Sequence, residues 1–73
     1  MQQLAVAYRV ETLSGRVYSG AVAVPAATAT GACGLVRSLI YGRYDHKYSR
    51  PACFDEFDIS EIEDVGVTCL GPA

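Results

Sequence analysis

The chain has no tryptophan, only two phenylalanines and a single histidine among its 73 residues. Its core must therefore come from leucine, isoleucine, valine and the five tyrosines, and much of the 51% hydrophobic fraction is small alanine. That fraction is too high for intrinsic disorder. A chain of this length buries only about 60% of the surface that it exposes when unfolded. The sequence predicts one domain, residues 1–73, with a thin core that is compatible with a homodimer.

Long apolar runs are also missing, and none approaches the roughly 20 residues needed to cross a bilayer. The first residues, Met1-Gln2-Gln3, lack the basic start of a secretory signal, and Arg9 interrupts the apolar stretch that follows. Three widely spaced cysteines, Cys33, Cys53 and Cys69, do not form the even pattern of a disulfide framework. We therefore expect a cytoplasmic protein with free, partly buried thiols and no membrane partner.

The sequence contains no glycine-rich phosphate loop, no dinucleotide-binding fingerprint and no HExxH motif. His46 with the three cysteines could form a Cys3His zinc site, but no two of these residues have the close spacing of a zinc knuckle. Cys53 and His46 could act as nucleophile and base, but no oxyanion-binding element accompanies them. We therefore predict no enzyme activity, no catalytic residue, no metal site and no cofactor. A small enzyme or ligand-sequestering protein that uses Cys53 and His46 is a weaker alternative.

The first third of the chain predicts an antiparallel hairpin. Residues 4–12 alternate between larger apolar side chains and small or charged ones, which is the pattern of a half-buried strand. Residues 13–16 form a turn in which Gly15 can take a positive φ. A second strand spans residues 17–24 and ends at Pro25, because proline cannot donate to a ladder. Tyr8 and Tyr18 lie on adjacent strands, where they could form a cross-strand pair.

Residues 26–41 predict a helix, with Thr28 or Thr30 as N-cap and Gly42 as the stop. Its apolar face consists of Ala29, Ala32, Cys33, Val36, Leu39 and Ile40.

Residues 43–53 form a polar loop, and residues 54–70 have strand character with a bulge or break at 61–64. We expect residues 71–73 to be a frayed tail. The fold class is α+β, a two-layer ββαβ(β) sandwich with an antiparallel sheet and one helix packed on one face.

Charge is distributed unevenly along a chain of net charge −2. Six of the eight acidic residues fall within residues 55–64, and four of the six basic residues lie just before them, within residues 37–50. The acidic residues could form a negative strip toward a basic partner, or they could be the polar face of an edge strand that resists aggregation. The acidic candidates for partner binding are Asp55, Glu56, Asp58, Glu61, Glu63 and Asp64.

A basic, tyrosine-rich loop is the second candidate surface. Tyrosine is favoured at interfaces because it is large, rigid and amphipathic. Basic residues mixed with aromatic residues are also typical of nucleic-acid-binding surfaces, but a pI near 5.1 makes direct nucleic-acid binding a weak interpretation. The same bases could instead pair with the acidic segment. The candidates of this loop are Tyr41, Arg43, Tyr44, Lys47, Tyr48 and Arg50.

The layout YRVETLSGRVYSGAVAVPAATATGACGLVRSLIYG, followed by DISEIEDV, resembles small ββαβ proteins of phages and mobile elements. This group includes anti-CRISPR proteins of type I systems, and the likeness lies in size, acidity and order of elements. The resemblance implies a stoichiometric inhibitor in the cytoplasm of a bacterial host cell. Such an inhibitor occupies a nucleic-acid-binding or nuclease-recruitment surface of a CRISPR effector complex. A dimeric regulatory or structural domain, such as a toxin–antitoxin or phage assembly component, is the alternative.

Overall fold

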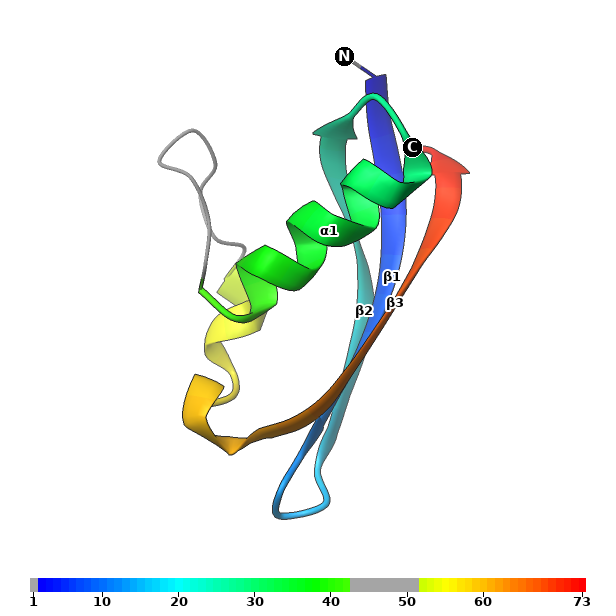
Figure 1. Ribbon diagram of the computed structural model, residues 1–73. Coiled ribbons are helices and arrows are strands. Elements are labelled where there is room, and N and C mark those ends of the chain that lie inside the picture. Colours follow the sequence, from blue (N-terminus) through cyan, green and yellow to red (C-terminus); the bar gives the residue numbers. More distant parts are fainter. Residues whose placement is uncertain (1, 43–51) are drawn as a thin grey trace.

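The computed structural model describes residues 2–42 and 52–73, and it confirms the predicted α+β fold (Figure 1). The sheet has the strand order β2-β1-β3, with antiparallel pairing throughout, and α1 packs against one of its faces. The elements are β1 (Gln2–Thr12), β2 (Val17–Ala26), α1 (Ala29–Ile40), the short 3₁₀ helices η1 (Ala52–Asp55) and η2 (Ile59–Glu61), and β3 (Ile62–Pro72).

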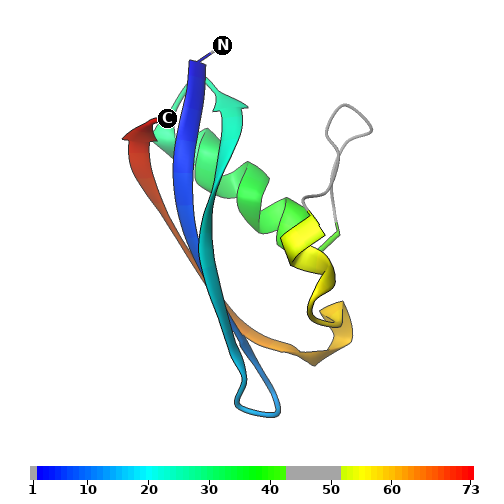
Figure 2. The same cartoon turned by 180° about the vertical axis from the view of Figure 1, so that it is seen from behind.

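The two faces of the sheet differ, as the side chains of the central strand β1 show. From Leu4 to Thr12, its even-numbered side chains lie on the face that α1 covers and are buried, as the alternation predicted, and Val6 and Val10 are completely so. Its odd-numbered side chains lie on the other face, which Figure 2 shows from behind without a helix across it. The hydrophobic core is therefore a single layer between α1 and the sheet.

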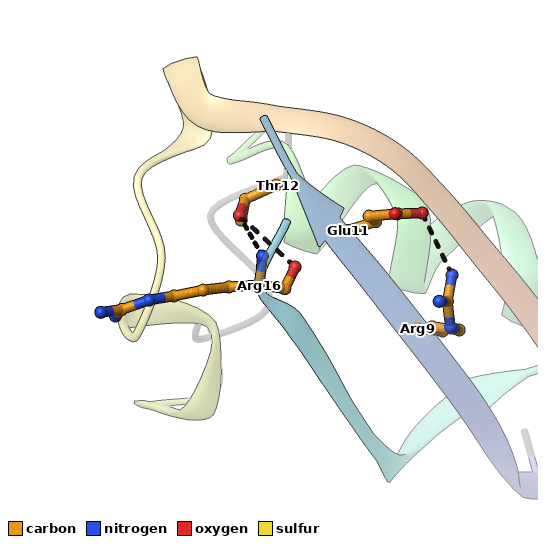
Figure 3. A network of polar contacts seen from close by, with 4 residues as sticks. All are labelled: Arg9, Glu11, Thr12 and Arg16. Carbon is orange, nitrogen blue, oxygen red and sulfur yellow. Dashed lines mark hydrogen bonds and ion pairs between the residues drawn. The ribbon is translucent and has the colours of Figure 1, made fainter. Parts of the chain in front are cut away.

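The turn between β1 and β2 explains why the hairpin closes where it does. The N–H of Thr12 donates to the carbonyl of Arg16 at 2.9 Å, and the N–H of Gly15 donates to the carbonyl of Thr12 at 3.0 Å. Gly15 has φ 88°, as a three-residue hairpin loop with a G1 bulge requires. The buried hydroxyl of Thr12 also accepts from the N–H of Arg16 at 3.1 Å (Figure 3).

The predicted end of the second strand at Pro25 is wrong, because β2 continues to Ala26. Pro25 pairs with Gln3 in a strand at the edge of the sheet. Thr12 and Arg16 form a hydrogen-bonded pair, and hydrogen-bonded and non-bonded pairs alternate along an antiparallel ladder. By this alternation Pro25 is in a non-bonded pair, and its backbone nitrogen faces away from β1. A proline costs no ladder hydrogen bond at such a position.

The helix α1 forms as its apolar spacing predicts, although it is shorter at its start. The Thr28 side chain accepts from the N–H of Gly31 at 3.0 Å, so Thr28 rather than Thr30 is the N-cap. Tyr41 is the C-cap, and Gly42 follows with φ 72°. Buried residues on the predicted face are Ala32, Val36, Leu39 and Ile40, with Cys33 partly buried and Ala29 exposed.

The sequence predicted strand character between residues 54 and 61, and this prediction is wrong because η1 and η2 form in this segment instead. Phe54 and Phe57 lie three residues apart, and both are buried against the sheet. Phe54 meets the ring of Tyr8 edge-on at 4.9 Å between centroids, and Phe57 meets Tyr18 at 5.3 Å. Tyr8 and Tyr18 therefore each pack against one phenylalanine ring.

The suggested pairing of Tyr8 with Tyr18 is wrong as well. The register of the hairpin sets Tyr8 opposite Gly20 and Val10 opposite Tyr18. Gly20 leaves room for the Tyr8 ring on the buried face, because a Cβ at this position would lie 2.9 Å from the Tyr8 hydroxyl oxygen.

The expected frayed tail is also wrong, since β3 runs to Pro72 and pairs with the start of β1. The N–H of Ala73 then donates to the carbonyl of Gln3 at 2.9 Å. The bulge expected near residues 61–64 is confirmed, because Ile62 and Asp64 face consecutive residues of β1 and leave Glu63 as an extra residue. A second irregularity, which we did not predict, leaves Leu70 unpaired and exposed.

Candidate functional site

The acidic segment projects into solvent at the hairpin end of the sheet. Glu56 follows η1, Glu61 ends η2, and Glu63 and Asp64 begin β3; these side chains are exposed, as is that of Asp58. In the part of the chain that the structure describes, none of these carboxylates has an ion-pair partner within 4 Å. Asp55 is the last residue of η1. Glu56, Asp58, Glu61, Glu63 and Asp64 are exposed, and their role as a negative strip toward a partner stays a prediction.

Three contacts from the sheet hold this segment in place. The N–H of Leu13 donates to the carbonyl of Glu61 at 2.8 Å, which ties η2 to the hairpin turn. Ile62 pairs with Thr12 at the start of β3, and Phe57 packs on Tyr18. The carboxylates therefore project from a backbone that is anchored on both sides, so their arrangement is built into the fold.

Asp58 differs from its acidic neighbours because it has a structural role. Its carboxylate accepts from the N–H of Ser60 at 3.0 Å and from the Ser60 hydroxyl at 2.9 Å, and it caps η2. These hydrogen bonds lower the pKa of Asp58. A substitution at Asp58 would therefore disturb the local backbone as well as remove a charge.

Arg16 adds a positive charge near this end of the molecule, which the sequence did not single out. Its guanidinium points away from the turn (Figure 3). The neighbouring Tyr18 first, and then the charge of Glu61, raise the pKa of Arg16. Arg9 and Glu11 form an ion pair of 3.5 Å on the open face, where both side chains are exposed enough for it to contribute little.

Most of the predicted basic tyrosine loop lies outside the described residues, namely Arg43, Tyr44, Lys47, Tyr48 and Arg50. Tyr41 is described: it caps the end of α1, is partly buried, and packs against the core. That position makes Tyr41 in part a structural residue. His46, the proposed base for Cys53, also lies outside the described residues.

The face of the sheet opposite α1 carries mainly small side chains. Ala5 and Ala7 of β1 lie between Ala21 and Ala23 of β2 on one side and residues of β3 on the other. Gly66 and Thr68 continue this face on β3. In this part of the face no side chain is larger than that of threonine, so another backbone can approach the sheet closely.

Cys53 has a neighbour that sequence spacing could not identify. Cys53 of η1 lies close enough to the hydroxyl of Tyr8 to influence its titration. Burial first, and then the nearby Cys53 and the charge of Glu56, raise the pKa of Tyr8 from 10.0 to about 12. Cys33 on α1, Cys53 on η1 and Cys69 on β3 are free and partly buried.

No pocket opens among the described residues, and in the same part of the chain no group of three His, Cys, Asp or Glu side chains could hold a metal ion. None of the described helices is long and apolar enough to cross a membrane. The chain matches no protein-family model, no curated protein and no solved structure.

Proposed function

We propose that this chain is a binding inhibitor, which acts without catalysis by occupying a basic surface of a bacterial defence complex of the CRISPR type. The observation that carries the proposal is the group of exposed carboxylates toward the hairpin end of the sheet. The order of elements, which resembles that of type I anti-CRISPR proteins, supports the choice of partner. The inhibitor works in the bacterial cytoplasm, where such complexes act.

The charge of this end suits a partner that normally binds nucleic acid. Such a partner lines its groove with lysine and arginine, and a protein that places carboxylates there competes with the phosphate backbone. Glu61 and Glu63 are the most informative positions, because both side chains are exposed and neither forms a hydrogen bond within the part of the chain that the structure describes. Charge complementarity of this kind mainly raises the association rate and is weakened by salt.

The open face of the sheet is the second feature that favours binding over catalysis. The part of this face formed by alanine, glycine and threonine lets a partner approach the sheet closely, and the carboxylates at one end would set the orientation. In this proposal the acidic end steers the encounter and the open face adds contact area.

The test uses purified CRISPR effector complexes of type I and measures both binding and inhibition of target-DNA binding. The variant Glu61→Gln with Glu63→Gln removes two negative charges and leaves the Asp58 cap intact. Its matched control, Gln2→Lys with Gln3→Lys, changes the net charge by the same amount at the far end of β1, where both glutamines are exposed.

We expect wild type to inhibit, the Gln variant to lose about ten-fold or more in affinity at low salt, and the Lys control to retain inhibition. A ten-fold loss corresponds to about 1.4 kcal/mol, which two lost charge contacts can supply. Absence of binding to every complex tested would contradict the choice of partner. Equal losses in the two variants would show that only net charge matters and would contradict a role for this end.

A further inference from the structure

The two edges of the sheet differ in how they resist pairing with another strand. Natural proteins protect exposed edges with charges, bulges and prolines. The edge strand β3 has Glu63 and Asp64, two irregularities of register, and Pro72. The other edge strand, β2, has no charged residue and pairs with β1 without a register shift, so only Pro25 protects it near its end.

The outer backbone groups of β2 follow from the hairpin geometry. Thr12 and Arg16 form a hydrogen-bonded pair, and bonded and non-bonded pairs alternate along an antiparallel ladder. The odd-numbered residues of β2 are therefore the non-bonded partners of β1, and their N–H and C=O groups face outward. The bond from Ala73 to the carbonyl of Gln3, which lies on the β3 side of β1, agrees with this alternation. Among the residues that the structure describes, no backbone carbonyl accepts from the outward N–H groups of Val17, Ser19, Ala21 and Ala23.

The helix side of the same edge is incompletely covered. Val22 sits in the middle of β2, opposite the fully buried Val6, yet it is only partly buried. Tyr18 is likewise partly buried, although its ring packs on Phe57. The crossing of α1 over the sheet in Figure 1 therefore leaves apolar side chains partly exposed along the outer edge of β2.

We infer that β2 is a self-association edge, at which the β2 strands of two copies of this chain pair antiparallel to form a continuous six-stranded sheet. A two-fold axis at Gly20 sets Ser19 opposite Ala21 of the second copy and Val17 opposite Ala23. This register uses every free outward N–H of β2 and leaves Pro25 outside the pairing. It also sets Tyr18 opposite Val22 of the second copy, an aromatic and β-branched pair of the kind that stabilises sheets.

A second copy suits this edge for electrostatic reasons. An uncharged strand that pairs with itself brings no like charges into opposition, whereas the acidic start of β3 would do so. The acidic segment lies near the Val17 end of β2, and antiparallel pairing separates the two segments by a distance on the order of the strand length, roughly 30 Å. Their repulsion is then largely screened at physiological salt. Because the paired strip is narrow, we expect a weak dimer whose population depends on concentration.

The test measures molar mass by sedimentation equilibrium as the concentration of the full chain rises, in reducing buffer to prevent disulfides between copies. The variant Ala21→Pro removes an outward N–H and fills its place with the proline ring. The fold tolerates Pro25 at the equivalent outward position, so we expect this variant to remain folded. Circular dichroism checks that expectation.

A second variant tests the edge if Ala21→Pro does not fold. Ser19→Lys with Ala21→Lys places lysines opposite lysines across the proposed pairing. Its matched control, Gly66→Lys with Thr68→Lys, adds the same charge to the same face on the other edge strand. Both control residues are exposed, and a Cβ at Gly66 meets no atom within 4 Å.

We expect the mass of wild type to double with concentration, the Ala21→Pro and β2 lysine variants to stay monomeric, and the β3 control to dimerise like wild type. Amide exchange at Ser19, Ala21 and Ala23 should slow as the dimer forms. A wild-type chain that is still monomeric near about 1 mM would overturn the inference. Dimers of the β2 lysine variant, loss of dimer in the β3 control, or open-ended aggregates would overturn it too. These results do not depend on the proposed inhibition, because no defence complex is present.

Discussion

Replacing Gly20 by alanine should destabilise the fold, although the same change in most strands is neutral or favourable. Gly20 lies opposite Tyr8 on the buried face of the sheet. A Cβ at this position would lie 2.9 Å from the Tyr8 hydroxyl oxygen and 3.2 Å from two carbons of its ring. Tyr8 cannot easily move away, because the residue is only 8% exposed and its ring packs edge-on against the fully buried Phe54.

The expected magnitude is a balance of two terms. Overpacking of this kind costs about 1–3 kcal/mol, whereas alanine gains roughly 0.5–1 kcal/mol over glycine inside a strand. The net loss in the free energy of unfolding is then about 1–2 kcal/mol. For a domain of this size that loss corresponds to a fall in Tm of roughly 5–15 °C.

Urea denaturation followed by circular dichroism, together with thermal melting, measures the loss in Gly20→Ala. The matched control is Gly66→Ala in β3, where a new Cβ meets no atom within 4 Å and stability should rise or stay unchanged. Adding Tyr8→Phe removes the closest contact, so Gly20→Ala should cost less in that background. A Gly20→Ala protein as stable as wild type, at an unchanged m-value, would refute the proposed close packing of Tyr8 on Gly20.

Three further outcomes follow from the core, the helix and the buried tyrosine. Phe54→Ala should cost about 3–5 kcal/mol, enough to leave the chain largely unfolded at 37 °C; a cooperative native-like melt would contradict this. Thr28→Ala should cost about 1 kcal/mol through loss of the α1 cap, whereas Thr30→Ala, one residue inside the helix, should be nearly neutral in urea titrations. The raised pKa of Tyr8 favours its neutral form in the fold, so this stabilisation is complete below pH 10 and is lost as pH rises toward 12. Ultraviolet titration should show one late tyrosinate that Tyr8→Phe removes and that Cys53→Ala shifts to lower pH, and titration of all tyrosines together would contradict it.

The elements that the sequence predicted well are those whose signals are local. The alternation of β1 and the helical spacing of α1 each depend on one face that must be buried, so residue spacing alone places Val6, Val10, Val36 and Leu39 in the core. Gly15 and Gly42 likewise mark the positive-φ positions at the hairpin turn and after the helix. The order β-β-α-β followed from these signals.

The wrong predictions share a different cause. Phe54 and Phe57 are compatible with a strand in isolation, and they form 3₁₀ turns because both rings must reach the tyrosines on the sheet. Pro25 normally ends a strand, but the ladder register turns its missing N–H outward. Residues 71–73 become ordered only because β1 offers them an unpaired edge.

The candidate site divides in the same way. The positions of the acidic residues in the sequence showed that they cluster, and because these side chains are charged, we expected them to be exposed. The tertiary structure decided that Asp58 is a capping residue, that Arg16 lies near Glu61, and that β2 is the uncharged edge. The sequence by itself determined which residues are apolar, charged or turn-forming, since those are properties of short segments. The pairing of distant segments depends on the packing of the whole chain, and only the tertiary structure decided which face and which edge of the sheet remain open.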